Sequence, residues 1–353
     1  MAASYLIYGA NGYTGELIAR EAKARGETPV LGGRKAAALS QLADELGFAH
    51  RAFKLDEPKA LDAALAGVRL MLNCAGPFSR TAKPMVDACL RNRVHYVDVT
   101  GEVDVFEAIA ARDQDAKSAG IVLLPGAGFD VVPSDCLAAH LKRRLPSATH
   151  LALGFRALGG GVSRGTALST LEGMGKPNLV RRNGLLTEAP MGASSRMVDF
   201  GRGRGPSTAI SIPWGDVSTA YHSTGIPNID VFVGLPSIMK HVLKWNGRLA
   251  PLLRSSRVQS WLESRVRKGR AGPTAEQRAR GRSYLWGEAR DDAGTIVTSR
   301  MQTPEGYALT VLTALATVEK LLAGMAPSGF MTPSKAFGPD FILQIPGTAR
   351  SDD

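Results

Sequence analysis

The sequence has few cysteines and no long apolar run. Its three cysteines form no C-x-x-C pair and have no histidine at metal-ligand spacing. So sparse and odd a count argues against a disulfide framework and is typical of buried thiols in a reducing compartment. The longest uncharged apolar stretch, 306–318, is shorter than the roughly 18 residues that a membrane-spanning helix needs. Residues 1–4 lead directly into an apolar strand and leave no room for a signal peptide, so we expect a cytoplasmic protein.

Several catalytic signatures are also missing. A short-chain dehydrogenase needs a lysine four residues after its catalytic tyrosine to lower the pKa of the phenol, and none of the seven tyrosines has one. The sequence contains no G-x-S-x-G elbow, no metal-spaced histidine pair and no G-x-x-x-x-G-K-S/T loop. It also has no groove-reading motif. These absences exclude the usual forms of those enzymes. We therefore expect no bound metal and no nucleic-acid partner.

Charge is unevenly distributed along the chain. The net charge is +11, yet residues 1–135 contain 15 basic and 17 acidic side chains, a net charge of −2. Residues 240–282 contain twelve Lys or Arg and only two Glu, a net charge of +10. The basic excess is therefore a local feature of the later chain.

Two parts of this basic region resemble amphipathic helices. Segments 237–245 and 258–268 carry Trp245 and Trp261 among basic residues. Such helices suit anionic lipid or an acidic carrier protein, so segment 237–270 is a candidate for peripheral contact with the inner face of a membrane. A solvated basic face on a surface insertion explains the same pattern.

What the sequence does have is a glycine turn near its start. An apolar strand ending at Tyr8 leads through the turn into a helix with apolar residues at helical spacing. Such a turn directs free backbone N–H groups and the positive end of the helix dipole at one point, which suits a pyrophosphate. An ordinary strand-to-helix turn is the alternative. We expect a dinucleotide to bind at Gly9, Asn11, Gly12, Tyr13, Thr14 and Gly15.

The end of the next strand indicates which dinucleotide. In an NAD site, an Asp or Glu about twenty residues beyond the glycine turn accepts hydrogen bonds from the ribose hydroxyls. This chain has Arg34 and Lys35 there instead. A guanidinium makes a charge-assisted contact with the 2′-phosphate that NAD lacks, so we predict NADP(H). A solvated pair of charges at a helix start is the alternative.

Two later strand ends extend the predicted cofactor site. Asp56 follows a strand over 49–55, where it would border an adenine ring or cap the next helix. The apolar run from residue 68 breaks at small residues that would let the nicotinamide half lie close to backbone. These residues are Cys74, Ala75, Gly76 and Pro77. We interpret Cys74 as a small core residue rather than a reactant.

Strands and helices alternate through the first third of the chain. After the first two strands we expect strands over 49–55, 68–78, 95–99 and 121–124 and helices over 37–47, 58–66, 82–92 and 103–118. This alternation builds a parallel sheet whose ligands bind beyond the carboxyl ends of its strands. Later the pattern changes to a helix over 134–145, strands over 149–157, 196–200, 208–212, 229–234, 283–290 and 295–302, and a buried helix over 305–323. The predicted fold class is α/β, a Rossmann-type doubly wound parallel sheet with a second α/β or α+β domain.

Five ordered motifs in the first 135 residues, with scattered matches beyond, resemble the saccharopine dehydrogenase-like oxidoreductases. The chain is similar especially to the branch that contains mycobacterial trans-acting enoyl reductases. The motifs lie at 9–15, 32–34, 73–78, 96–102 and 126–135, and the scattered matches at 165–166, 306–307 and 331–333. The resemblance implies an NADP-binding Rossmann domain over 1–135 with segment 305–353 packing back on it, and a substrate or oligomerisation domain over 136–304.

A nicotinamide site also needs a proton donor. Three acids fall at predicted strand ends, and one Tyr-His pair lies in the second domain. The candidates are Asp98, Glu102, Asp130, Tyr221 and His222. Capping or turn formation would explain the acids structurally, and core packing would explain the pair.

We expect an NADPH-dependent oxidoreductase that transfers a hydride to an enoyl C=C or to a C=O or C=N group. No Arg or Lys clamp for an α-amino acid stands out, which favours a carbonyl or enoyl acceptor, and an enolate needs hydrogen-bond donors rather than a strong acid. The substrate would be a small molecule or be bound to a carrier protein, and we expect a homodimer. The alternative is a non-catalytic or membrane-associated NADP(H)-binding protein.

Overall fold

The chain forms two compact units. The computed structural model describes residues 5–353 except 174–176, 191, 193, 202–204 and 235–254. Unit 1 consists of Met1–Phe129 and Leu309–Phe337, and unit 2 of Asp130–Ala308 and Gly338–Asp353. The motifs predict a boundary at residue 135 and place 305–353 with the first domain. In the structure the chain leaves unit 1 after Phe129, and the last 16 residues belong to unit 2.

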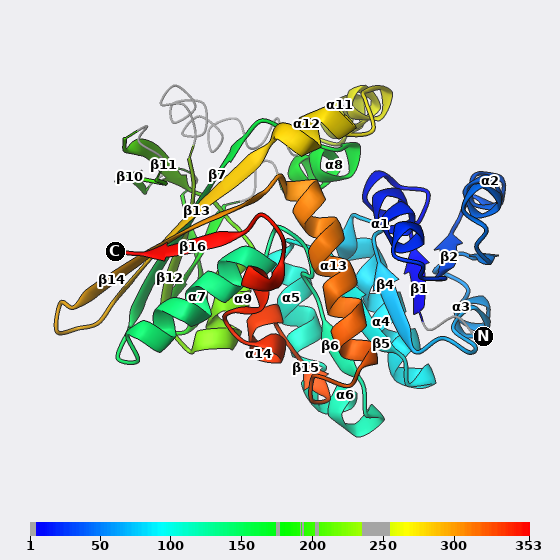
Figure 1. Ribbon diagram of the computed structural model, residues 1–353, viewed down its shortest axis with the longest axis horizontal. Helices are drawn as coiled ribbons and strands as arrows, with labels where there is room; N and C mark the ends of the chain where they lie inside the picture. The colour runs from blue at the N-terminus through cyan, green and yellow to red at the C-terminus, as the bar shows by residue number, and fades with distance from the viewer. Residues whose placement is uncertain (1–4, 174–176, 191, 193, 202–204, 235–254) are drawn as a thin grey trace. The chain divides into compact units, whose positions relative to one another are not determined.

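Unit 1 is built on a parallel sheet (Figure 1). Its strands are β1 (Tyr5–Tyr8), β2 (Val30–Gly33), β3 (His50–Ala52), β4 (Leu70–Asn73), β5 (His95–Asp98), β6 (Val122–Leu124) and β15 (Gly329–Phe330). They lie in the order β15-β6-β5-β4-β1-β2-β3, and each neighbouring pair is parallel. The order reverses between β1 and β4. The glycine turn after β1 therefore lies at the switch point where such sheets bind ligands.

Helices cover both faces of this sheet. They are α1 (Tyr13–Ala24), α2 (Ala36–Leu46), α3 (Pro58–Ala64), α4 (Phe78–Asn92), α5 (Val103–Ala110), α6 (Asp113–Ala119), α13 (Gly306–Leu322) and α14 (Pro333–Phe337). Side chains alternate along each strand: Ile7 and Leu72 join a core with α1, α2 and α13, whereas Leu6 and Met71 join a core with α3, α4 and α5. The predicted doubly wound parallel sheet is confirmed.

Two predicted helices differ from those observed. The single helix expected over 103–118 is two helices, separated at Arg112, whose guanidinium is bound by Asp87 and Asp115. Helix α4 begins at Phe78 rather than at residue 82, because Glu102 accepts hydrogen bonds from its first N–H groups. The start of α4 thus depends on a side chain that is distant in sequence.

Unit 2 carries a second, mixed sheet. Its strands are β7 (His150–Leu158), β8 (Asn178–Arg182), β9 (Leu185–Ala189), β10 (Ser195–Val198), β11 (Ser207–Ser211), β12 (Asn228–Gly234), β13 (Arg282–Arg290), β14 (Ile296–Pro304) and β16 (Ala349–Asp352). The main order is β10-β11-β12-β7-β13-β14-β16, in which β12 and β7 are parallel and the other pairs antiparallel. The β8–β9 hairpin, which pairs with β12, was not predicted.

Unit 2 also contains helices. They are α7 (Val132–Arg144), α8 (Arg164–Gly173), α9 (Asp216–Thr224), α11 (Ser256–Lys268) and α12 (Ala275–Arg280), with a short 3-10 helix at Phe341–Gln344. Helix α7 contacts β7, β13 and β14, and α9 contacts both α7 and β12. The opposite face carries its own apolar cluster, which includes Phe200, Phe232, Tyr284 and Trp286.

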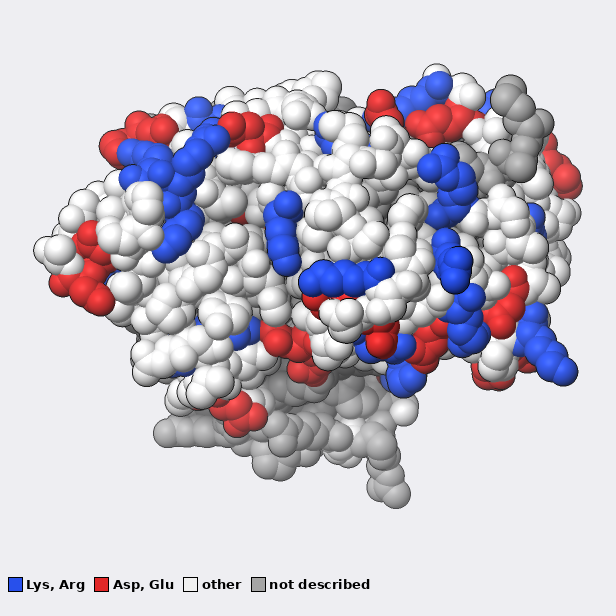
Figure 2. Space-filling view, turned by 90° about the horizontal axis from the view of Figure 1, so that it is seen from below, with Lys and Arg blue, Asp and Glu red and all other residues white. Residues whose placement is uncertain are grey.

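The described surface mixes both signs of charge. Figure 2 shows Lys and Arg interspersed with Asp and Glu on one face of the molecule. The predicted basic helix over 237–245, with Trp245, lies outside the described residues. The one over 258–268 falls in α11, where Trp261 is 58% exposed. Within the described ranges, no helix is both long and apolar enough to cross a membrane.

We expect Gly15→Ala to destabilise unit 1. A Cβ at Gly15 would lie 2.9 Å from Ala10 Cα and still closer to the carbonyl oxygen of Gly9, and neither backbone atom can move without opening the turn. Overpacking of this kind costs about 1–3 kcal/mol, which urea unfolding would measure. At the control position Gly165 the nearest atom is 3.7 Å away, so Gly165→Ala should be neutral or slightly stabilising. Equal stability of the two variants would contradict this packing argument.

Candidate functional site

The glycine turn of unit 1 is held by backbone contacts. The N–H of Gly12 donates to the carbonyl of Gly9 over 2.8 Å, and Glu16 N–H donates to Gly12 over 2.8 Å. Gly9 has φ +79°, a conformation that favours glycine. Gly12 is the N-cap of α1, so the first N–H groups of this helix face the turn. The arrangement can bind an anion through backbone donors and the helix dipole.

Cys74 and Ala75, which are also predicted cofactor residues, lie against this turn. A Cβ on Gly9 would lie 3.0 Å from the backbone N of Ala75, so the ends of β1 and β4 are in close contact. The Cys74 N–H donates to the carbonyl of Tyr8 over 2.8 Å. A Cβ on Gly33 would lie 3.3 Å from Oδ1 of Asn11, which places the Asn11 side chain beside the end of β2. Unit 1 thus brings the ends of β1, β2 and β4 together around one turn.

Tyr8 joins this group, although the sequence analysis did not select it. Burial raises the pKa of its phenol to about 12, the nearby charge of Arg34 lowers it and that of Asp56 raises it. Arg34 and Asp56 therefore both lie near Tyr8, and both are exposed, as is Lys35. The N-cap of α3 is Glu57, so Asp56 is not the capping residue that the alternative proposed. The hydroxyl of Tyr8 is buried and has no hydrogen-bond partner within the described residues.

The remaining predicted cofactor residues follow β4. Cys74 and Pro77 are half-buried and Gly76 is exposed. Burial, with a smaller effect of the Asp98 charge, raises the pKa of the Cys74 thiol. The thiolate is the nucleophilic form of cysteine, so this environment fits the interpretation of Cys74 as a small packing residue.

Asp98 organises the ends of β5 and β6 from a fully buried position. Its Oδ1 accepts hydrogen bonds from the N–H groups of Thr100 (3.0 Å) and Gly126 (2.8 Å), and its Oδ2 accepts one from the Tyr96 hydroxyl (2.8 Å). Asn73 donates to the same hydroxyl. Burial raises the pKa of Asp98 to about 6 although these bonds lower it. Both carboxyl oxygens are thus engaged in holding neighbouring strand ends.

Glu102 has a comparable structural role at the start of α4. Its two carboxylate oxygens accept the N–H groups of Phe78 and Ser79, each over 2.8 Å. A carboxylate on the first N–H groups of a helix is stabilised by hydrogen bonds and by the dipole. The capping alternative considered for this acid therefore describes its geometry well.

Asp130 is the first residue of unit 2. Its backbone carbonyl accepts a 2.9 Å hydrogen bond from Nε1 of Trp214, whose ring packs on Phe155 at 4.6 Å. Burial raises the pKa of the Asp130 carboxyl to about 6. Unlike the side chains of Asp98 and Glu102, that of Asp130 is not tied to backbone N–H groups in the described part of the chain. The anchored backbone holds a carboxyl group that keeps its proton to an unusually high pH.

Two further acids lie close to Asp130, and the sequence analysis did not select them as candidates. Asp135 accepts a short hydrogen bond from Ser223, and Asp216 accepts one from Thr219 at 3.5 Å. Both acids are fully buried, and the Oδ2 of Asp216 has no partner among the described residues. Burial, and then the charges of Asp135 and Asp130, raise the pKa of Asp216 well above its ordinary value. No motif marks Asp216; only the fold brings these acids together.

Tyr221 and His222 are placed differently. Asp216, Thr219 and Ser223 share one face of α9 at helical spacing, and Tyr221 points away from it. The Tyr221 ring lies 4.2 Å from the guanidinium carbon of Arg181, which is fixed by the carbonyls of Val217 and Gly184. His222 packs edge-on against Tyr221 at 5.9 Å. Within unit 2 the pair therefore lies against the β8–β9 hairpin rather than beside the carboxyl of Asp130.

Comparison with known proteins shows what the first unit is similar to. Residues 5–124 match the family model of the saccharopine dehydrogenase NADP binding domain. A probable mitochondrial saccharopine dehydrogenase-like oxidoreductase of Arabidopsis thaliana is 30% identical over 147 residues, 37% of this chain and 32% of that protein. A trans-acting enoyl reductase of Mycobacterium leprae is 30% identical over 148 residues, 40% of this chain and 35% of that protein. The resemblance noted from the motifs is confirmed, and so is the predicted cofactor, NADP.

The match to a solved structure covers more of the chain. Apo saccharopine dehydrogenase (L-Glu forming) of Saccharomyces cerevisiae has a TM-score of 0.67 over 99% of both chains, at 12% identity. This likeness concerns the fold. In sequence, the chain spans about a third of the Arabidopsis and mycobacterial proteins.

Asp216→Asn should change how stability depends on pH. Because the folded-state pKa of Asp216 is raised, the folded state keeps a proton that the unfolded state releases above about pH 4. Stability is therefore lost as the pH rises from the unfolded-state pKa towards the folded-state pKa. Asn resembles the protonated acid and removes this loss.

We expect urea unfolding to show that Asp216→Asn is more stable than the unmodified protein at pH 8, by on the order of 1 kcal/mol, with a smaller gain at pH 4. The control is Asp230→Asn, which breaks a half-buried ion pair with Arg182 at 2.8 Å and should lose stability at pH 8. A loss at pH 8 for Asp216→Asn as well would refute the assignment.

Proposed function

Because unit 1 contains a saccharopine dehydrogenase-type NADP-binding domain, we propose that this protein is an NADPH-dependent oxidoreductase. The observation that carries the proposal is the glycine turn at the switch point of the parallel sheet, packed against the end of β4. A bound nicotinamide cofactor would supply the hydride. The protein would supply binding, orientation and a proton.

The proposed cofactor site assigns a role to each strand end. The turn residues Gly9, Asn11, Gly12, Tyr13, Thr14 and Gly15 would hold the pyrophosphate. Arg34 and Lys35 would bind the 2′-phosphate, because they are exposed cations at the end of β2. Asp56 would border the adenosine half, and Cys74, Ala75, Gly76 and Pro77 the nicotinamide half.

The proposed hydride acceptor is an enoyl C=C, or a C=O or C=N group, on a small or carrier-bound substrate. The mycobacterial relatives are named trans-acting enoyl reductases, which supports the first of these. In an enoyl reduction the hydride adds at the β carbon, and a proton then reaches the enolate. Asp130 is the proposed donor, because burial raises the pKa of its carboxyl to about 6, whereas the oxygens of Asp98 and Glu102 already accept hydrogen bonds that hold neighbouring strand and helix ends. Tyr221 and His222 remain weaker candidates.

A non-catalytic NADP(H)-binding protein that contacts a membrane is the second candidate. The exposed Trp261 on α11, with Arg265 stacked on it at 5.3 Å, is the observation that favours it. Peripheral contact through segment 237–270, a cytoplasmic location and a homodimer belong to the same set of proposals. Tight NADPH binding without turnover on any acceptor would favour this candidate.

Arg34→Ala tests the cofactor assignment. Losing one charge-assisted contact costs about 1.5–3 kcal/mol, so the Kd for NADPH measured by calorimetry should rise at least about tenfold. The Kd for NADH, which lacks the phosphate, should change less than about twofold. Lys59→Ala removes an exposed positive charge from α3 and should leave both values unchanged. Equal losses for NADPH and NADH would show that Arg34 does not recognise the phosphate.

Asp130→Asn tests the proton donor. A donor must be protonated, so turnover should fall as the pH rises above about 6. The kcat of the variant should be about 100-fold lower, and its turnover should no longer fall as the pH rises above about 6. NADPH oxidation would be followed with enoyl thioesters, ketones and imines. As a matched control, Glu102→Gln should lower stability because it weakens the cap of α4, but its turnover should still fall above about pH 6. If turnover of Asp130→Asn still falls above about pH 6, Asp130 is not the proton donor.

A further inference from the structure

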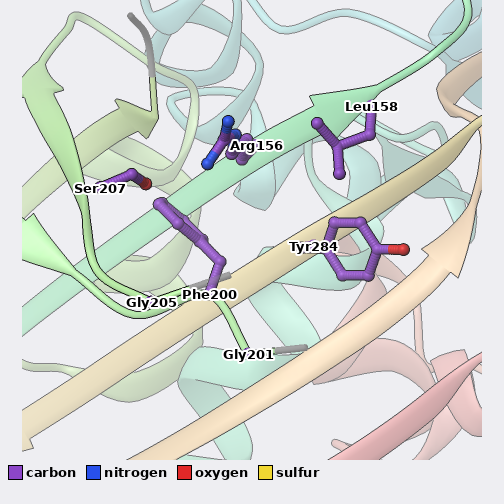
Figure 3. Close-up of a pocket in the computed structure, with 7 residues that line it drawn as sticks. All are labelled: Arg156, Leu158, Phe200, Gly201, Gly205, Ser207 and Tyr284. Carbon is purple, nitrogen blue, oxygen red and sulfur yellow. The ribbon is translucent and has the colours of Figure 1, made fainter. Parts of the chain in front are cut away.

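A pocket opens on the face of the unit 2 sheet that carries Phe200, Phe232 and Trp286 (Figure 3). Its volume is about 240 Å³, and it is lined by residues of β7, β11 and β13 together with Phe200, Gly201 and Gly205. The proposed oxidoreductase function uses none of these residues.

Glycines shape the floor of this pocket. A Cβ on Gly234 would lie 2.8 Å from the Phe200 ring and 3.1 Å from Arg156 Cβ, and one on Gly154 would lie 3.5 Å from the same ring. Because both strand positions lack a side chain, Phe200 lies directly on the sheet and is only 6% exposed. Tyr284 on β13, 7% exposed, and Leu158 on β7 add apolar surface. One side of the pocket is therefore aromatic and aliphatic.

Two polar groups in the pocket have no partner within the described residues. The hydroxyl of Ser207 is buried without a hydrogen bond. Arg156 is half-buried, and no described carboxylate pairs with it. Figure 3 shows its guanidinium nitrogens on the side of Ser207 and Phe200, whereas the Tyr284 hydroxyl points away.

Neighbouring arginines are different, because each has a carboxylate. Arg196 contacts Glu288 at 3.0 Å and stacks on Trp286 at 4.4 Å. Arg300 binds the carbonyl of Asp199 and pairs with Asp353. Arg156 is thus a half-buried cation in a concave site with no carboxylate beside it among the described residues, which is costly unless a ligand completes it.

We propose that this pocket binds a small organic carboxylate with an apolar or aromatic body. The planar guanidinium of Arg156 would form a two-bond contact with the carboxylate, and the Ser207 hydroxyl would donate to one of its oxygens. The apolar body would pack on Phe200, Leu158 and Tyr284. One cation balances one carboxylate, whereas a phosphate dianion would leave negative charge unpaired. The volume lies below the roughly 300–1,000 Å³ of pockets for drug-sized ligands, which indicates a small molecule.

The test uses 3-phenylpropionate as the probe, with the full-length protein and isothermal calorimetry. We expect a Kd of about 1 mM or tighter. The uncharged 3-phenylpropanamide, which keeps the shape, should bind at least about tenfold more weakly. Arg156→Ala should weaken the propionate at least about tenfold, and Arg156→Lys should weaken it less, because lysine keeps the charge but loses the fork. Ser207→Ala should weaken it severalfold.

Arg290→Ala is the matched control, because Arg290 is an exposed arginine on β13 away from the pocket. The Arg290→Ala variant should bind 3-phenylpropionate as tightly as the unmodified protein. NADPH affinity, which reports on unit 1, should be the same in every variant, so failure of this proposal is distinguishable from failure of the proposed function. If the propionate does not bind, or binds equally to Arg156→Ala with unchanged NADPH affinity, the pocket assignment is overturned. Tighter binding of 2-phenylethyl phosphate than of the propionate would overturn the choice of a carboxylate.

Discussion

The close approach of Gly15 to the Gly9 carbonyl is the constraint on which unit 1 depends. With no Cβ at residue 15, α1 starts directly on the end of β1, and its first N–H groups face the space beyond the sheet. The same turn also lies against the ends of β4 and β2, because Gly9 is close to Ala75 and Asn11 is close to Gly33. The positions of three strand ends therefore follow from one backbone contact, and a larger residue would displace all of them.

Asp98 extends this order across the sheet at an electrostatic cost. A buried carboxyl is unfavourable unless its oxygens accept hydrogen bonds, and here Thr100, Gly126 and Tyr96 supply them. The network makes the ends of β5 and β6 one rigid edge. It also explains why an acid at a strand end need not be catalytic: a carboxyl with all its acceptors occupied has little freedom to exchange a proton with a substrate.

Local sequence signals predicted unit 1 far better than unit 2. Each strand of the parallel sheet is a short apolar run between glycine or polar breaks, and each helix repeats its apolar residues, so the alternation is visible without tertiary information. The β8–β9 hairpin has exposed residues such as Leu185 and no apolar alternation, because its pairing with β12 defines it. Strand β16 and the Glu102 cap likewise depend on partners far along the chain. Arg34 was visible because a missing acid is a local signal, whereas Asp216 and Arg156 acquire meaning only from their neighbours.

The acids of unit 2 differ from those of unit 1 in what compensates them. Asp98 and Glu102 are bound to backbone N–H groups, which favour the ionised form. Asp216 has one oxygen without a partner among the described residues and lies near Asp130 and Asp135, whose charges oppose its ionisation. Carboxyls this close do not ionise independently, so protons leave the group in steps that belong to the set. The raised pKa of Asp130 is due to burial, whereas the ionisation of Asp216 is also opposed by the neighbouring acids. Burial of its own carboxyl therefore sets the acidity of the proposed proton donor.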